Sequence, residues 1–139
     1  MANNCIESGD SRRLILLAED DAFSRKVTRS MLEHLGYHVD IALNGIEVLH
    51  ALECKPYDIV LMNIGMPLMD GFEATRQIRR LRKNGLKIIA ITARVLPGIR
   101  KKCLIAGMND CIGKPVKLNE LAEMLSKHSS KLICNEQAC

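Results

Sequence analysis

The chain has 139 residues, and its 20 basic and 16 acidic side chains give a formal net charge of +4. This length suits one domain and leaves no room for two substantial ones. Hydrophobic residues make up 47% of the chain, which excludes wholesale disorder, and aromatic residues only 3%, which argues against a nucleic-acid surface of stacked rings. The small positive excess favours no class of partner, because solvated helix faces account for it.

The apolar runs of the chain are short. The longest strictly apolar run is Leu14–Ala18, far below the roughly 20 residues that span a bilayer. The polar start, MANNCIESGDSRR, lacks the apolar stretch of a signal peptide. The six cysteines form no CxxC pair, and several lie in apolar segments, where a free Cys behaves as a small hydrophobe. We therefore expect a reduced, cytoplasmic protein with no membrane contact.

Five short apolar runs alternate with helical patterns. The runs that predict strands are 14–18 (LILLA), 38–42 (HVDIA), 58–62 (DIVLM), 87–92 (KIIAIT) and 109–112 (NDCI). Between the runs, apolar residues recur three and four positions apart, which is typical of helices that bury one face. The first such stripe comprises Phe23, Val27, Met31 and Leu35. Strands joined by crossover helices predict an α/β fold: a doubly wound, five-stranded parallel sheet with helices on both faces.

The sequence also predicts where one helix begins and where the domain begins and ends. Asn44, three residues before Glu47, is typical of a capping box that opens the second helix. Residues 1–12 and 129–139 are polar and lack periodicity. We therefore expect a flexible N-terminal segment, one domain over 13–128 and a flexible C-terminal tail over 129–139.

Polar residues follow four of the predicted strands. A parallel sheet places ligands beyond the carboxyl ends of its strands, where the strand order switches. Each of these residues alone is weak evidence, because acidic residues often cap helices and lysines are usually exposed. Together they predict one site at this edge of the sheet. They are Glu19, Asp20 and Asp21 after the first strand, Asn63 and Gly65 after the third, Thr92 after the fourth, and Lys114 with Pro115 after the fifth.

Four longer stretches carry a family resemblance. They are LILLAEDDAFSRKV, DIVLMNIGMPLMDGFEATRQIR, IIAITA and AGMNDCIGKPVKLNEL. Over residues 13–127 the chain resembles the receiver domain of two-component response regulators, most closely the receivers of hybrid histidine kinases. The resemblance implies a flavodoxin-like (βα)5 fold with strand order 2-1-3-4-5. It also implies a place in phosphorelay signal transduction, through a cycle of aspartyl phosphorylation.

The resemblance further implies a role for each residue of the site. Glu19 and Asp20 match the acidic pair that holds Mg²⁺, and the backbone carbonyl of Gly65 matches the third protein ligand. Thr92 matches the hydroxyl that grips a phosphoryl oxygen, and Lys114 the ammonium that bridges to it. These types suit the chemistry, because Mg²⁺ prefers carboxylate and phosphate oxygens while a hydroxyl and an ammonium neutralise charge on the transferring group.

The phosphoryl-acceptor position departs from the family pattern. The family carries Asp at the end of the third strand, where this chain has Asn63. The nitrogen lone pair of an amide is delocalised into its carbonyl, so Asn is no nucleophile for phosphoryl transfer. We therefore expect a receiver that cannot accept phosphate as it stands, is no enzyme, and binds Mg²⁺ weakly or not at all. A naturally degenerate receiver and an engineered Asp-to-Asn change both remain open.

Two further positions bear on switching. Lys114–Pro115 resembles the family's cis peptide, which aims the lysine into the pocket. Cys111 stands three residues before Lys114, where many receivers have an aromatic residue whose rotation reports phosphorylation. Because Cys is small and apolar, we expect no such rotation in this chain.

The partners implied by the resemblance are a histidine kinase, a phosphotransfer protein or an output domain, docking near helix one or helices four and five. Direct binding to nucleic acid is not expected. The alternative is a pseudo-receiver that acts as a protein-binding module without any phosphorylation. An unrelated doubly wound enzyme is disfavoured, because the chain has no GxGxxG, GxxxxGK[ST] or GxSxG motif.

Overall fold

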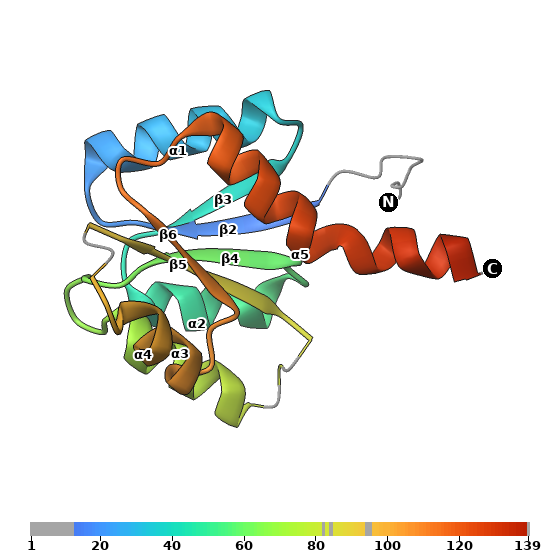
Figure 1. Ribbon diagram of the computed structural model, residues 1–139. Coiled ribbons are helices and arrows are strands. Elements are labelled where there is room, and N and C mark those ends of the chain that lie inside the picture. The colour runs from blue at the N-terminus through green and yellow to red at the C-terminus, as the bar shows by residue number, and fades with distance from the viewer. Residues whose placement is uncertain (1–12, 82, 84, 94–95, 139) are drawn as a thin grey trace.

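The computed structural model describes residues 13–81, 83, 85–93 and 96–138, with side chains as far as residue 129. Strands and helices alternate along this part of the chain (Figure 1). In chain order they are β2 (Leu14–Ala18), α1 (Ala22–His34), β3 (His38–Ala42), α2 (Gly45–Cys54), β4 (Ile59–Asn63), α3 (Gly71–Arg80), β5 (Lys87–Thr92), α4 (Ile99–Ala106), β6 (Asp110–Gly113) and α5 (Leu118–Ala138).

The strands form one parallel sheet in the order β3-β2-β4-β5-β6, which confirms the predicted order 2-1-3-4-5. Helices α1 and α5 cover one face of the sheet, and α2, α3 and α4 cover the other (Figure 1). Strand β3, which follows β2 in the chain, pairs with one edge of β2, and β4 pairs with the other edge. The carboxyl ends of the neighbouring strands β2 and β4 therefore mark the switch in strand order, where such sheets bind ligands.

The core has two layers, one on each face of the sheet. Because successive side chains of a strand point to opposite faces, a central strand contributes to both layers. In β2, Leu16 packs with the residues beneath α2, α3 and α4, whereas Ile15 and Leu17 pack with those beneath α1 and α5. The buried hydrophobic residues are aliphatic or sulfur-containing throughout. None of the helices in the described ranges is long and apolar enough to cross a membrane.

Side-chain caps begin the helices that follow the site. Asn44 accepts a hydrogen bond from the Glu47 N–H at 2.9 Å, which confirms it as the cap of α2. Glu47 reaches back to the Leu43 N–H at 2.8 Å, one residue before the cap, so the reciprocal bond of the predicted capping box is shifted by one residue. Asp21 caps α1 and Asp70 caps α3 as Asn44 caps α2. These caps fix where the two site loops end, because Asp21 closes the loop after β2 and Asp70 the longer loop after β4.

The buried face of α1 differs from the predicted stripe. Thr28 and Leu32 are its buried residues, and Phe23 is 76% exposed. Helical periodicity identifies an apolar stripe but not the point along the helix where contact with the sheet begins. Phe23, in the first turn of α1, therefore belongs to the apolar stripe by sequence but not to the core.

The last helix runs past the predicted C-terminal boundary. The domain was predicted to end at residue 128, with a flexible tail over 129–139, but α5 continues through that boundary to Ala138. The segment 129–138 contains neither Gly nor Pro, so nothing in its backbone chemistry ends the helix. The predicted flexible segment 1–12 lies outside the described residues.

Candidate functional site

The amide of Asn63 lies at the centre of the carboxyl edge. Asn63 is the last residue of β4 and is buried, and its Nδ2 faces three oxygen atoms. These are Oε2 of Glu19 at 3.0 Å, Oδ1 of Asp20 at 3.0 Å and the carbonyl oxygen of Gly65 at 3.1 Å. The side chain therefore acts here as a hydrogen-bond donor, shared among three acceptors that converge on one point.

Lys114 supplies a positive charge to this cluster. Its Nζ lies 2.9 Å from Oε1 of Glu19, a side chain that is 1% exposed. The Lys114–Pro115 peptide bond is cis, as the resemblance predicted. Two carboxylates thus face one ammonium and one amide, and the cluster keeps a net negative charge.

Thr92 completes the set. It ends β5, is buried, and lines a cavity of about 480 Å³ together with Asn63, Gly65 and Lys114. The structure therefore brings six of the predicted residues to one edge. They are Glu19, Asp20, Asn63, Gly65, Thr92 and Lys114.

Two residues that support the site were given no role by the sequence. A Cβ on Gly71 would lie 2.7 Å from the carbonyl oxygen of Asn63, so only glycine lets α3 start this close to the acceptor position. Arg25 of α1 donates to the backbone carbonyls of Glu19 at 3.1 Å and Asp20 at 3.3 Å, which fixes the acidic loop. Asp-Gly after a strand was a visible turn signal, whereas nothing near Arg25 in the sequence indicates its contact.

Asp21 and Cys111 have other surroundings. The Asp21 carboxylate accepts the Ser24 N–H at 2.8 Å as the cap of α1, and this hydrogen bond holds the pKa of Asp21 below its usual value. Asp21 is thus occupied by a structural contact. Cys111 lies on β6 and packs against the core cluster that contains Cys103, and it is not among the residues that line the cavity at Asn63.

The donor set fits a hard divalent cation only in part. Two carboxylates and one carbonyl oxygen converge on a point, and these are the ligand types that Mg²⁺ prefers. That point is taken by the amide nitrogen of Asn63, which cannot ligate a metal; half a turn about χ2 would present Oδ1 instead. No group of three or more His, Cys, Asp or Glu side chains able to hold a metal occurs among the described residues.

Comparison with known proteins gives consistent matches. The family model described as "Response regulator receiver domain" matches residues 15–126. Hybrid signal transduction histidine kinase B of Dictyostelium discoideum is 39% identical over 127 residues, covering 82% of this chain and 6% of that protein. The first curated relatives are much longer proteins, of which this chain spans between 6% and 16%.

Solved structures show the same architecture. The receiver domain of sensor histidine kinase PA1611 from Pseudomonas aeruginosa, solved with a magnesium ion coordinated in its active site cleft, is 42% identical. It matches with a TM-score of 0.76 over 84% of this chain and 97% of that one. A second match is the co-crystal structure of the phosphotransfer protein Ypd1 and the receiver domain of Ssk1 from Saccharomyces cerevisiae. It has 25% identity and a TM-score of 0.78, over 83% of this chain and 87% of that one.

Proposed function

Because this chain belongs to the response regulator receiver domains of two-component phosphorelay signalling, we propose that it is a receiver blocked at its acceptor position. Asn63 stands in the place of the phosphoryl-accepting aspartate, so the chain cannot accept phosphate as it stands. The other residues of its receiver site are retained, so the block rests on this one side chain.

The surroundings of Asn63 carry this proposal. An aspartate at this position would present an anionic oxygen to Glu19, Asp20 and the Gly65 carbonyl, and a cation would be needed to hold the group together. The amide replaces that cation with a hydrogen-bond donor. The same amide offers no electron pair with which to attack phosphorus, so no phosphoryl group can be transferred to this side chain.

The remaining parts of a receiver pocket are in place for a cation and a phosphoryl group. Glu19, Asp20 and the Gly65 carbonyl would hold Mg²⁺, as the active site cleft of the PA1611 receiver does. We expect weak binding, because affinity for hard cations depends on anionic oxygens and the site has two carboxylates. Thr92 and Lys114 line the same cavity and would face phosphoryl oxygens.

The edge of the site beside α1 suits a protein partner. Phe23 is exposed and, with Val27, Pro115 and Val116, lines a cavity of about 310 Å³ that borders Lys114. Exposed apolar surface beside a charged site is typical of a docking surface. We propose that a phosphotransfer protein or histidine kinase docks here; the co-crystal structure of Ypd1 with the Ssk1 receiver domain supports this kind of partner. An output domain at α4 and α5 is the alternative.

The decisive experiment restores the carboxylate. Asn63→Asp changes an amide to a carboxylate at almost constant volume, and with a small-molecule phosphoryl donor and Mg²⁺ we expect a base-labile phosphoryl adduct at position 63. The unchanged protein should take up none. Labelling is measured by intact mass and the site by peptide mapping. Labelling of the unchanged protein at Asp20, Asp21 or Asp58 would contradict the proposal.

Two variants in the Asn63→Asp background control this test. Lys114→Ala should impair labelling, because it removes the ammonium that faces the phosphoryl group. Lys117→Ala removes an exposed lysine three residues later and should have no effect. A folded Asn63→Asp protein that takes no label would favour the second candidate, a pseudo-receiver with no phosphorylation cycle. That candidate is supported by the fact that the Asn63 amide satisfies the acidic cluster without a metal.

A further inference from the structure

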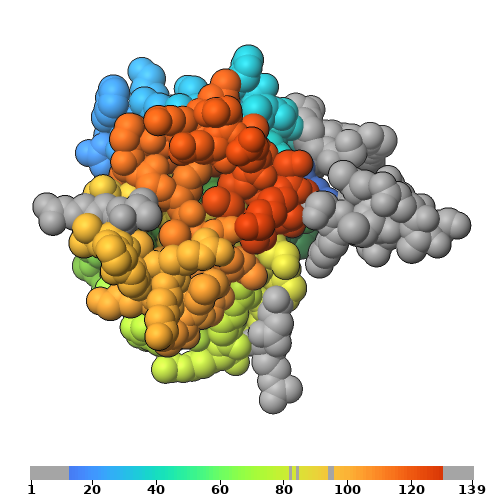
Figure 2. All heavy atoms as spheres, in the orientation of Figure 1, coloured from blue at the N-terminus to red at the C-terminus, as the bar shows by residue number. Residues whose placement is uncertain are grey.

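A second cavity, of about 490 Å³, lies at the amino edge of the sheet, at the opposite end of the strands from Asn63. Its walls come from the residue before β2, the end of α2 with the loop to β4, the loop from α3 to β5, and α5. Lys87, the first residue of β5, lines this cavity, whereas Thr92, the last residue of that strand, lines the cavity at Asn63. Figure 2 shows the red atoms of α5 against the yellow atoms of the segment that begins β5. No residue lines both cavities, so the second one is no part of the receiver site.

Positive charge predominates in the lining of the amino-edge cavity. Four cationic side chains and two carboxylates line it: Arg13, Lys55, Lys83, Lys87, Glu53 and Asp58. Asp58 pairs with Arg13 at 3.5 Å. Lys55 pairs at 2.9 Å with Asp40, which lies outside the lining. These two ion pairs leave Lys83 and Lys87 with one other charged group, the carboxylate of Glu53, which is exposed and therefore hydrated.

Lys83 and Lys87 are both half-buried, although lysine is a residue that proteins mostly leave exposed. Within the described ranges, neither ammonium has an ion-pair or hydrogen-bond partner. A charged group that loses part of its water is stabilised by a counter-charge. Two cations thus line one cavity without a counter-charge from the protein, which is the electrostatic requirement for binding an anion.

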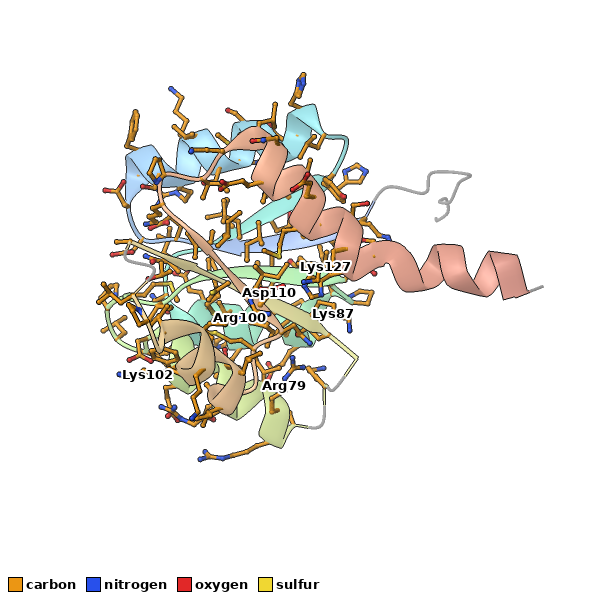
Figure 3. All side chains as sticks on the ribbon, in the orientation of Figure 1. Arg79, Lys87, Arg100, Lys102, Asp110 and Lys127 are labelled. Atoms are coloured by element: carbon orange, nitrogen blue, oxygen red, sulfur yellow. The ribbon has the colours of Figure 1, made fainter. Side chains whose placement is uncertain are left out.

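The loop that carries Lys83 is held in place by Arg79 of α3. The Arg79 guanidinium donates to the backbone carbonyl of Lys83, to that of Gly107 at 2.9 Å and to Oδ1 of Asn109 at 3.0 Å. Figure 3 shows Lys87 at the end of β5 that lies beneath α5. One lysine is therefore carried by an anchored loop and the other by a strand of the sheet, so the backbone beneath both charges is fixed before any ligand binds.

The rest of the lining includes apolar surface. Leu52 and Leu86 are buried residues that line the cavity, and Tyr57 lines it with its hydroxyl engaged by Asp40 at 2.6 Å. The volume lies within the range of pockets that hold small organic ligands. An inorganic anion would fill only a small part of it. The cavity therefore suits a molecule with a charged group and an apolar body.

Ser129 of α5 gives an independent indication of a missing partner. Ser129 lines the same cavity, and its Oγ is the only buried side-chain nitrogen or oxygen atom without a hydrogen-bond partner among the described residues. Buried polar atoms in native proteins are nearly always hydrogen-bonded. A ligand with oxygen atoms would supply an acceptor for this hydroxyl after rotation about χ1.

We propose that the amino-edge cavity binds a small organic phosphate, with its phosphoryl group at Lys83 and Lys87 and its apolar body against Leu52, Tyr57 and Leu86. A phosphate monoester carries nearly two negative charges at neutral pH, which matches two ammonium groups, whereas a carboxylate carries one. Lysine binds phosphate as a point charge and needs no fixed fork geometry. The inference does not depend on phosphorylation, because no residue of the Asn63 cavity takes part.

The experiment titrates the full chain with adenosine 5′-monophosphate in a phosphate-free buffer that contains EDTA, and follows backbone amide shifts by NMR. Adenosine tests the body without the charge, and inorganic phosphate tests the charge without the body. We expect saturable shifts at the amides of Lys83, Gly85 and Lys87, and several-fold tighter binding of the monophosphate than of either control compound. Circular dichroism confirms that each variant used below is folded.

Charge variants of opposite sign sharpen the test. Lys87→Gln and Lys83→Gln should each weaken binding of the monophosphate several-fold, and Glu53→Gln should tighten it, because it removes a carboxylate from the lining. Lys102→Gln, which removes an exposed charge on α4 outside the cavity, should leave the affinity unchanged.

Four results would overturn the proposal. They are the absence of saturable shifts with millimolar monophosphate, shifts confined to the amides around Asn63, adenosine or inorganic phosphate binding as tightly as the monophosphate, and equal affinities of the Lys87→Gln and Lys102→Gln proteins.

Discussion

Glu19 and Asp110 are both buried carboxylates, but different groups surround them. Glu19 shares its edge of the sheet with a second acid, Asp20, and the pair faces one ammonium and one amide. Asp110 is a single acid that accepts from Arg100, from Lys127 at 3.1 Å and from the Cys111 N–H, with His128 at 3.2 Å. The first cluster has an excess of negative charge and the second an excess of donors.

The two carboxylates therefore have different roles. Glu19 belongs to a site that can bind a ligand, and Asp110 is a structural clamp, a carboxylate that joins three elements of the fold. The Glu19 cluster retains oxygens that can bind a cation, and it opens into a cavity of about 480 Å³. The lone pairs of Asp110 are taken by groups from α4, β6 and α5, so the carboxylate joins three elements and has little left to offer a ligand (Figure 3). Burial alone would not distinguish the two acids.

The largest effect is expected from removing the ammonium at the first cluster. Lys114→Met leaves the buried Glu19 without its only charged donor among the described residues, and removing one partner of a buried pair costs about 3 kcal/mol. Urea unfolding without Mg²⁺ measures the loss. Lys117→Met, on the exposed surface, should change stability by less than about 0.5 kcal/mol. Equal effects of the two substitutions would mean that Glu19 does not depend on Lys114.

Removing Asp110 should cost less. The Arg100 and Lys127 side chains are 55% and 63% exposed, so both remain hydrated in Asp110→Ala, and the loss is that of the hydrogen bonds. We expect about 2 kcal/mol by urea unfolding. The exposed pair Arg29–Glu33 provides the contrast, since Glu33→Ala should cost about 0.5 kcal/mol or less. A loss at Asp110 as small as that at Glu33 would contradict its role as a clamp.

Asn63→Asp should lower stability without Mg²⁺ and should respond more strongly to the ion than the unchanged protein. Without the ion, a third carboxylate faces two others, and we expect a loss of about 1 kcal/mol. With Mg²⁺, the thermal midpoint should rise more in Asn63→Asp than in the unchanged protein. NaCl at matched ionic strength separates binding from screening. The same Mg²⁺-induced rise in both proteins would contradict the weak cation site.

The smallest effect concerns pH. Burial raises the pKa of Asp110, but hydrogen bonds from Arg100, the Cys111 N–H, Lys127 and His128 outweigh it, so the folded pKa lies below the usual value. A lowered pKa stabilises the fold fully above the unfolded value of about 3.9, and this contribution is lost as pH falls through that value toward the folded one. The stability difference between the protein and Asp110→Ala should therefore shrink from pH 7 to about pH 3. A constant difference would exclude the linkage.

Much of the fold and of the candidate site could be predicted from the sequence. Alternating apolar runs and helical patterns predicted every strand to within one residue at either end, and the five-stranded parallel sheet follows from them. Polar residues at strand ends predicted the cluster of Glu19, Asn63 and Lys114, because parallel strands bring their carboxyl ends to one edge. The strand order and the role of each residue came from the family resemblance.

Only the tertiary structure decided how individual side chains pair. Local periodicity placed Phe23 in the apolar stripe of the first helix, but the folded chain leaves it exposed. The pairing of Arg100 with Asp110 depends on how α4 packs on β6, and that packing arises from the whole core. The sequence determines which residues reach an edge or a face through backbone periodicity, which is local. Which donor meets which acceptor depends on distances between elements far apart in the chain, and only the folded core sets those distances.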